Sequence, residues 1–330
     1  MAEPIKGRTL AMGEQEAVPG AAIDMPFGTA LVEVARRRPE IVGLTADLGK
    51  YTDIHPLRDA FPDRFFNVGM AEQNLIAVAA GLAKTGKIAF ATTYGVFATR
   101  RAYDFVAIAC AHSNANVKIV AGLPGLTTGY GGTHQAIEDL GLMMLVPNLT
   151  VIDPCDATDI MQATAAIADA PGTFYMRLQR ARVPVVLDPK RYRFRLGKAA
   201  LLREGGDVGI VATGIMTARA LEAADALAAE GVAASVLHVP TLKPFDREAL
   251  LALASRVPAL AVAENHVSRG GLATLVTEAL FDAGLSPLLA RIGLPDRFIE
   301  CGSLPHLQDK YGLSTPRVVE RVRALLKGKR

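Results

Sequence analysis

One segment of the sequence places a carboxylate where it could do chemistry. The run Phe65-Phe66-Asn67-Val68-Gly69-Met70-Ala71-Glu72-Gln73-Asn74 is typical of a short strand that ends at Gly69, followed by an apolar helix that Glu72 opens. A lone glutamate in a first helical turn commonly does no more than favour the helix dipole. In parallel sheets, however, ligands bind at the edge formed by the carboxyl ends of the strands. The sequence therefore predicts Glu72 at a ligand-binding edge.

Composition places the chain among folded proteins of two domains. The sequence has 330 residues, half of them apolar and 21% charged, which is long and apolar enough for two buried cores. It carries 36 Lys+Arg against 33 Asp+Glu, so no electrostatic case exists for nucleic acid or an anionic membrane as a partner. The longest apolar runs, such as Leu75–Ala83 and Phe105–Ala111, are far shorter than the roughly 20 residues that span a bilayer.

The cysteines and the N-terminal residues indicate a reducing compartment. Cys110, Cys155 and Cys301 form no CxxC pair, which argues against a disulfide framework and against a thiolate metal site. Residues 1–20 lack an apolar core flanked by basic residues, so we interpret them as a flexible arm and not as a secretory signal. We therefore expect a cytoplasmic protein.

Short β-rich runs alternate with helix-periodic segments along the first half of the chain. The strand candidates are Ile41–Thr45, Phe65–Val68, Ile88–Thr92, Val117–Ala121, Thr150–Ile152 and Phe174–Leu178. Helical periodicity covers Gly28–Arg37, Ala71–Lys84, Arg101–Ala111, His134–Met143 and Thr158–Asp169. Strands separated by helices need crossover connections, so they are predicted to form a largely parallel sheet with helices on both faces.

A proline-containing, basic stretch over residues 184–197 interrupts this alternation and is interpreted as an interdomain linker. The alternation then resumes on a smaller scale. Strands are expected at Val208–Thr213, Ala233–Val239, Leu260–Glu264 and Leu288–Ile292, and helices at Thr217–Glu230, Gly271–Ala283 and from a capping Ser314 to Lys327. The predicted class is α/β, with an arm over 1–20, a domain over 21–183, the linker, and a second domain over 198–330.

Generic nucleotide and metal motifs do not account for the sequence. The run from Gly81 to Lys87 resembles a phosphate loop, but it follows a helix, and Ile88 stands where Ser or Thr is needed. Gly86 is instead predicted to end that helix in a left-handed conformation. None of the six histidines has a partner at metal-ligand spacing, and no GxSxG motif occurs. We predict no metal site formed by this chain alone.

Several segments together resemble the transketolase family of thiamine-diphosphate enzymes. FFNVGMAEQN (65–74) resembles the family's pyrimidine-binding segment, and TTYGVFATRRAYD (92–104) resembles its aromatic pocket. Residues 125–159 follow in the expected order, and VPTLKPFD (239–246) resembles the C-terminal domain. The resemblance covers about residues 21 to 325. It implies a pyrimidine-binding domain followed by a transketolase C-terminal domain.

The resemblance also implies how the coenzyme is activated. In this family, thiamine diphosphate loses a thiazolium proton to become an ylid, and its own aminopyrimidine amino group drives the loss. Glu72 matches the glutamate that hydrogen-bonds the ring atom N1′ and makes the amino group basic. Tyr94 and Phe97 match the residues that stack on this ring. Arg101 lies at a neighbouring position that varies in the family, and the resemblance implies that it too contacts the coenzyme. Asp47 matches an aspartate near the coenzyme, although a turn-capping role explains it nearly as well.

The substrate side of the resemblance shows departures. His134 matches a histidine that faces the donor's hydroxyl groups, and it follows a glycine-rich turn. Leu123 stands in place of another histidine, and the single Tyr130 replaces a Glu-Asp pair, so a less polar or differently shaped donor is expected. Arg177 and Arg180 are available for a phosphate or carboxylate, and Arg180 matches better, although surface arginines after a strand explain both equally well.

The family's diphosphate and Mg²⁺ site is missing from this sequence. That site uses a Gly-Asp-Gly motif and a downstream asparagine, and no Gly-Asp-Gly occurs here. The resemblance therefore implies a split transketolase, in which a separate N-terminal subunit binds the metal and the diphosphate of thiamine diphosphate. We expect an obligate αβ pair, doubled to α2β2, and an enzyme that is active only with this partner.

The predicted function is the C-terminal subunit of a transferase that moves a two-carbon ketol unit from a ketose-like donor to an aldehyde. Two alternatives stay open. One is a subunit of another thiamine-diphosphate enzyme, which decarboxylates 2-oxo acids or resembles deoxyxylulose phosphate synthase. The other is a non-catalytic paralogue that regulates a partner, and the intact set of Glu72, Tyr94 and Phe97 argues against it.

Overall fold

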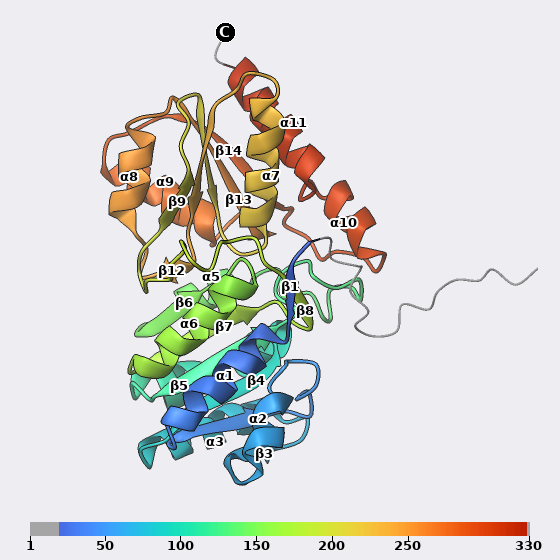
Figure 1. Ribbon diagram of the computed structural model, residues 1–330, viewed down its shortest axis with the longest axis vertical. Coiled ribbons are helices and arrows are strands. Elements are labelled where there is room, and N and C mark those ends of the chain that lie inside the picture. The colour runs from blue at the N-terminus through green and yellow to red at the C-terminus, as the bar shows by residue number, and fades with distance from the viewer. Residues whose placement is uncertain (1–19, 329–330) are drawn as a thin grey trace, which may run out of the picture.

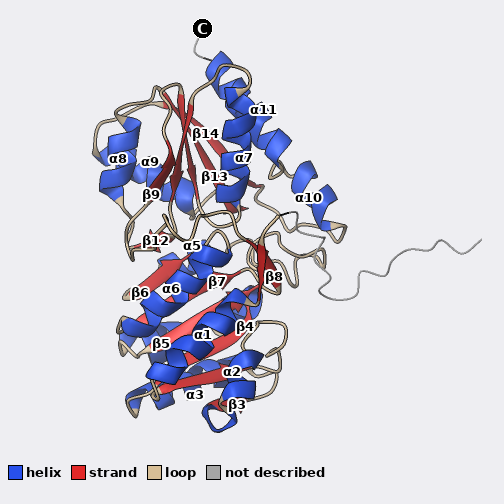
Figure 2. Cartoon of the chain, viewed as in Figure 1, coloured by secondary structure: helices blue, strands red, loops and turns tan. Residues whose placement is uncertain are grey.

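The computed structural model describes residues 20–328, and it contains two α/β halves that lie one above the other in Figure 1. Of the predicted arm, only Gly20 falls within this range. Each half has a mostly parallel sheet flanked by helices (Figure 2), which confirms the predicted two-domain α/β class. No helix among these residues combines the length and the apolar character needed to cross a membrane.

The first half is built on a seven-stranded sheet with the order β12-β6-β7-β5-β4-β2-β3. Its strands from the first half of the chain are β2 (Ile41–Thr45), β3 (Phe65–Asn67), β4 (Ile88–Tyr94), β5 (Val117–Gly122), β6 (Leu149–Ile152) and β7 (Thr173–Leu178), and they pair in parallel. The helices are α1 (Pro26–Arg37), α2 (His55–Ala60), α3 (Glu72–Lys84), α4 (Tyr103–Phe105), α5 (Asp139–Met144) and α6 (Ala157–Asp169). A short antiparallel ribbon joins β1 (Ala22–Asp24) to β8 (Arg182–Pro184).

Alternate side chains of these strands build one core on each face of the sheet. Phe90 and Val120 belong to the core beneath α1 and α6, whereas Ala91 and Ile119 belong to the core beneath α3. Because both faces are covered, the strands are apolar throughout, and this continuous pattern made them predictable.

The segment after β4 is helical, as predicted, but it is not a regular α-helix. Two π-helical stretches, Phe97–Arg101 and Val106–His112, flank the short α4. Such turns are rare and frequently occur at functional sites. The first of them contains two of the predicted site residues.

The second half is built on a five-stranded sheet with the order β14-β13-β10-β11-β9. Its elements are β9 (Ala200–Arg203), β10 (Val208–Ala212), α7 (Met216–Ala228), β11 (Ala234–His238), α8 (Arg247–Ala254), β13 (Ala259–Val267), α9 (Leu272–Asp282), β14 (Leu288–Leu294), α10 (Leu304–Lys310) and α11 (Thr315–Lys327). Strand β9 pairs antiparallel with β11, and the other pairs are parallel. Pro184 of the predicted linker belongs to β8, and its other residues, 185–197, contain no helix or strand.

One strand crosses from the second half to the first. Strand β12 (Thr241–Lys243) pairs antiparallel with β6 and so forms an edge of the seven-stranded sheet. The largest apolar core continues across the same boundary, since Leu237 and Val262 belong to the cluster that also contains Ala91. The two halves therefore share both a sheet and a core.

Two local predictions need correction and one is confirmed. The helix predicted over His134–Met143 begins only at Asp139, because the residues before it form an irregular loop in which Gly131 has a φ of 81°. Ser314 precedes α11, but its hydroxyl donates to Asp309 and does not cap the helix. Gly86 ends α3 with a φ of 87°, as predicted for a helix end and not for a phosphate loop.

The buried Glu264 should make folding stability depend on pH. Its carboxyl group lies in β13 and accepts the backbone N–H groups of Leu272 and Ala273 at the start of α9. Burial raises its pKa from 4.5 to about 7, and these N–H groups offset only part of that rise. Between these two values the unfolded chain releases the proton while the folded chain keeps it, so stability is lost as the pH rises.

We expect the contribution of Glu264 to the free energy of unfolding to fall by at most roughly 3 kcal/mol between pH 4.5 and 7. In Glu264→Gln the side chain stays neutral, so the unfolding free energy of the variant minus that of the wild type should increase with pH. Urea unfolding of both proteins at pH 5 and pH 8 measures this difference. A difference that does not change with pH would contradict the prediction.

Candidate active site

The predicted site residues lie at one edge of the seven-stranded sheet. Parallel pairing brings the carboxyl ends of β2, β3, β4, β5 and β7 to the same side. Asp47 follows β2, Glu72 follows β3, Tyr94 ends β4, and Arg180 follows β7. The loop with Tyr130 and His134 follows β5. This is the edge at which open α/β sheets bind ligands.

Glu72 is the first residue of α3, and its side chain is only 2% exposed. Nη1 of Arg101 donates to both of its carboxylate oxygens, at 2.9 and 2.8 Å. The Arg101 guanidinium also lies over the ring of Phe97, 4.3 Å from the ring centre. The structure therefore brings three predicted residues into direct contact and buries the carboxylate behind a half-exposed arginine.

Four rings gather beside this pair, and His134 is at their centre. The ring centre of His134 lies 6.3 Å from that of Tyr94, 5.6 Å from that of Phe97 and 5.7 Å from that of Tyr130. All three are edge-on contacts, whereas Tyr94 and Phe97 face each other at a tilt, 6.0 Å apart. The structure thus joins the predicted coenzyme residues to the predicted substrate residues.

The second half of the chain shapes the loop that carries Tyr130 and His134. Gly302 donates its N–H to the carbonyl of Gly129, and Tyr130 forms a β-bridge with Cys301. A side chain at Gly129 would begin only 2.0 Å from the Gly302 carbonyl oxygen, so the two backbones can touch only because residue 129 is glycine. The C-terminal residues therefore form a wall of the site.

Sequence reasoning missed two residues that hold the site in place. Arg100 donates to the carbonyl of Gly132 at 2.8 Å and pairs with Glu138, so it ties the π turn to the glycine-rich loop. Asn67 bonds Asp47 in both directions at 3.0 Å and also accepts the N–H of Gly69. A polar residue at the end of β3 was the available signal for Asn67, while no local pattern identified Arg100.

Asp47 and Arg180 lie at the edge but outside the ring cluster. Asp47 has a φ of 59°, and its exposed side chain is hydrogen-bonded to Asn67. This geometry agrees with the turn-capping alternative for Asp47. The Arg180 guanidinium lies 6.0 Å from the ring centre of Tyr51. Burial raises the pKa of Tyr94, and the positive charge of Arg180 offsets part of this rise.

Arg177 is not available for a substrate, which corrects the prediction made for it. Its side chain is 2% exposed and donates through Nε to Asp139 at 2.9 Å and through Nη1 to Asp153 at 3.2 Å. Nη1 also reaches the Asn265 carbonyl of β13 at 3.3 Å. Because β7 alternates its side chains, Arg177 points into the boundary between the two halves and not into solvent.

Three buried side chains between the two halves are of the types that bind metal ions, but they already form hydrogen bonds. Among residues 20–328, Cys155, Asp159 and His238 place ligand atoms within 4.8 Å of one another. The Asp159 carboxylate accepts the hydroxyl of Tyr192 at 2.8 Å and the backbone N–H of Cys155 at 2.9 Å, and His238 lies 3.0 Å away. Burial raises the pKa of the Cys155 thiol well above its ordinary value, which disfavours the thiolate that a metal needs.

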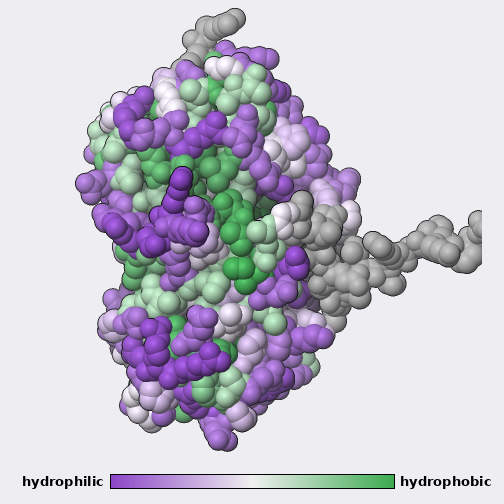
Figure 3. All heavy atoms as spheres, viewed as in Figure 1, coloured by the Kyte–Doolittle hydropathy of each residue, from purple (hydrophilic) through white to green (hydrophobic). Residues whose placement is uncertain are grey.

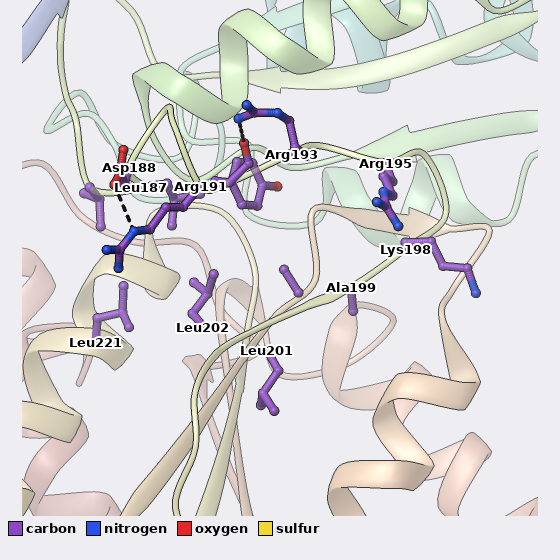
Figure 4. Close-up of a pocket in the computed structure, with 13 residues that line it drawn as sticks. Leu187, Asp188, Arg191, Arg193, Arg195, Lys198, Ala199, Leu201, Leu202 and Leu221 are labelled. Atoms are coloured by element: carbon purple, nitrogen blue, oxygen red, sulfur yellow. Dashed lines mark hydrogen bonds and ion pairs between the residues drawn. The ribbon is translucent and has the colours of Figure 1, made fainter.

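A cavity of about 660 Å³ is lined mainly by residues of the segment 186–202, together with Leu221 (Figure 4). Its floor is apolar and includes Leu201, Leu202 and Leu221, in keeping with the apolar side chains that surface between the two halves in Figure 3. The Arg191 side chain at its rim pairs with Asp188, and Arg193 donates to backbone carbonyls. None of the residues predicted for catalysis or binding lines it.

Two family models match the chain. Residues 20–185 match the pyrimidine binding domain of transketolase, and residues 197–318 match the transketolase C-terminal domain. A transketolase family protein of Sinorhizobium fredii is 52% identical over 303 residues, which is 91% of this chain and 88% of the relative. The chain belongs to the transketolase family.

Other relatives of this transketolase-family chain are separate subunits or longer proteins. A 6-deoxy-6-sulfo-D-fructose transketolase subunit of Clostridium sp. is 43% identical over 88% of this chain and 89% of that subunit, and a transketolase C-terminal section of Methanocaldococcus jannaschii is 36% identical over 90% and 93%. A 1-deoxy-D-xylulose-5-phosphate synthase of Dictyoglomus thermophilum is 34% identical over 91% of this chain, which spans 48% of that enzyme.

Among solved structures, a split-gene transketolase described as an inactive β4 tetramer has a TM-score of 0.86 and 45% sequence identity, over 94% of this chain and all of that one. The transketolase of Pichia stipitis, at a TM-score of 0.76 and 22% identity, shares the fold over 47% of its length. The sequence-based prediction of a transketolase C-terminal section is therefore confirmed at the level of the family.

Proposed function

We propose that this chain is the coenzyme-activating subunit of a split transketolase that transfers a two-carbon ketol unit from a ketose-like donor to an aldehyde. One observation carries the proposal. Glu72 is a nearly fully buried carboxyl group at the mouth of an aromatic cluster, on the ligand-binding edge of a parallel sheet. A buried carboxyl group at a ligand-binding edge is suited to hold a proton against a bound ring.

The described residues fit an aminopyrimidine ring. Such a ring presents nitrogen atoms at its edge and a flat face, and the site presents a buried carboxylate at Glu72 and the aromatic faces of Tyr94 and Phe97. When bound, thiamine diphosphate supplies the carbon nucleophile and the electron sink that ketol transfer requires. Glu72 would hold a proton at the N1′ atom, and its burial keeps that proton from exchanging with bulk water.

The other predicted residues face the substrate. The His134 imidazole, half-buried among three rings, would orient a donor hydroxyl, and its Nδ1 lies 2.9 Å from the Thr133 hydroxyl, which fixes the ring. Tyr130 offers one hydroxyl and an aromatic face at the same wall. Arg180 would receive the anionic end of the substrate, because a guanidinium fits a phosphate, sulfonate or carboxylate through paired N–H donors.

A partner must supply the remaining half of the coenzyme site. The sequence has no Gly-Asp-Gly motif, and residues 20–328 place no group of metal ligands beside Glu72. We propose that an N-terminal subunit binds Mg²⁺ and the diphosphate, in an α2β2 assembly. The relatives named as a C-terminal section and as a split-gene tetramer, the latter described as inactive, support this division.

A second candidate function is supported by the loop and by the synthase relatives. Tyr130 stands where the family has two acids that contact sugar hydroxyls, and 1-deoxy-D-xylulose-5-phosphate synthases match over 91% of the chain. In that case the enzyme would decarboxylate a 2-oxo acid instead of cleaving a ketose. The sulfofructose relative supports the ketose donor and suggests that its terminal group is anionic.

Mixing the two subunits tests the proposal. We expect this chain alone, and a Gly-Asp-Gly-containing partner alone, to be inactive with thiamine diphosphate and Mg²⁺, whereas the mixture transfers two carbons from fructose 6-phosphate or 6-deoxy-6-sulfofructose to an aldehyde. Pyruvate in place of the ketose distinguishes the second candidate by release of CO2. Activity of this chain alone would refute the need for a partner, and inactivity of the assembled mixture with every donor would favour the regulatory alternative.

A further inference from the structure

We propose that Arg101 occupies the place of the coenzyme's aminopyrimidine ring, and that the ring must displace it to reach Glu72. The inference rests on the proposed function and adds to it a control of coenzyme affinity. Arg101 was predicted to lie beside the ring; the geometry points to direct competition with it.

The two partners of Arg101 are the two groups assigned to the ring. Its Nη1 atom donates to both oxygens of Glu72, at 2.9 and 2.8 Å, where N1′ is proposed to bind. Its guanidinium lies 4.3 Å from the centre of the Phe97 ring, on which the aminopyrimidine is proposed to stack. A single side chain therefore uses both the edge contact and the face contact of the coenzyme site.

The chemistry of the two occupants is similar. A guanidinium is planar, carries N–H donors at its edge, and stacks on aromatic rings. An aminopyrimidine that binds a carboxylate through an N–H has the same three properties. Lysine would keep the charge but not the flat shape, so the contact with Phe97 identifies arginine as the matching residue.

Arg101 is also the member of the trio that can move. Glu72 is 2% exposed and is fixed as the first residue of α3, while the Arg101 side chain is 48% exposed at the end of the π turn. A guanidinium that leaves Glu72 would pass into water, because nearly half of the Arg101 side chain is already exposed. Within residues 20–328, no other side chain hydrogen-bonds the Glu72 carboxylate, so Arg101 alone satisfies this buried group before the ring arrives.

This arrangement has a measurable cost for binding. A ligand binds with an affinity reduced by the fraction of molecules in which its site is free. If Arg101 holds Glu72 in about nine molecules of ten, the dissociation constant of the coenzyme is raised about tenfold. Arg101 would thus keep Glu72 paired in the unassembled chain and release it only when the coenzyme and the partner are present.

The test is the affinity of the assembled enzyme for thiamine diphosphate, measured by isothermal titration calorimetry at saturating Mg²⁺. We expect Arg101→Gln to lower the dissociation constant about tenfold, and Arg101→Lys to lie between this value and the wild type. Arg247→Gln is the matched control, because Arg247 is 49% exposed and pairs with Asp282 at 3.0 Å in the second half of the chain. It should leave the affinity unchanged. Thermal melting of each variant checks that the fold is retained.

The outcomes separate this inference from the function on which it rests. A wild-type assembly that binds no thiamine diphosphate overturns both. If the wild-type assembly and the Arg101→Gln assembly bind thiamine diphosphate with the same affinity, only the proposed competition between Arg101 and the ring is overturned. A crystal structure of the coenzyme-bound assembly gives a second readout. A guanidinium turned away from Glu72 supports the inference, and one still paired with Glu72 overturns it.

Discussion

Replacing Glu72 with glutamine is expected to lower kcat of the assembled enzyme by about 10²- to 10⁴-fold, the range typical of a lost acid–base group. Glutamine keeps the shape and can still accept the N–H of Arg101 through its amide oxygen, but it has no proton to share with N1′. The variant would therefore lack the group that is proposed to make the amino group of a bound coenzyme basic. The fold should survive, because the variant removes a charge from the start of α3 without creating a cavity.

Steady-state kinetics of the reconstituted enzyme measure this effect, and thermal melting and gel filtration measure folding and assembly. Glu248→Gln is the control, since Glu248 is exposed and pairs with the exposed Lys198 at 3.6 Å in the second half. Activity of Glu72→Gln within threefold of the wild type would remove Glu72 from the mechanism. Loss of assembly together with activity would instead make Glu72 a structural residue.

Replacing Arg177 with methionine is expected to lower the unfolding free energy by about 3–5 kcal/mol, the range measured when one partner of a buried ion pair is removed. Methionine fills much of the space but leaves Asp139 and Asp153 buried without their cation. Burial already raises the pKa of Asp153 to about 6 against the opposing effect of Arg177. Without the guanidinium, both acids must be buried as unpaired charges or take up protons.

Urea unfolding at pH 8 measures the loss, and Arg219→Met is the surface control. Arg219 pairs with Glu222 at 3.4 Å where both are exposed, so its replacement should cost less than about 1 kcal/mol. Most of the lost stability comes from leaving Asp139 and Asp153 buried without a cation. Adding Asp139→Asn to Arg177→Met removes one of these charges and should recover part of the stability. A single Arg177→Met variant as stable as the control would show that this network does not stabilise the fold.

The strands of both sheets and most of the helices were predictable because their sequence pattern is local. Runs such as Ile41–Thr45 and Val208–Ala212 are β-rich and buried on both faces, so their apolar character is continuous. The strands missed, β1, β8, β9 and β12, are short edge or ribbon strands whose pairing depends on distant residues. The β-propensities of such short segments alone do not predict a strand.

The position of the candidate site residues at one sheet edge was predictable where they follow strands, but their contacts were less so. Glu72 and His134 were identified from their segments, but the helix predicted through His134 was wrong, because glycines in that loop hold it in contact with the second half. The pairing of Glu72 with Arg101 joins residues 29 positions apart. Arg177 shows the same limit, since its burial depends on Asp139 and Asp153 from other elements.

Strand β12 limits how the two halves of the chain can move relative to each other. It belongs to the second half by sequence but completes the first sheet against β6, and Lys243 adds a side-chain bond to the Met144 carbonyl at 2.9 Å. Moving the two halves apart would break the backbone hydrogen bonds between β12 and β6. It would also break the hydrogen bond from Arg177 to the Asn265 carbonyl. The pairing of β12 with β6 therefore opposes separation of the two halves at this boundary.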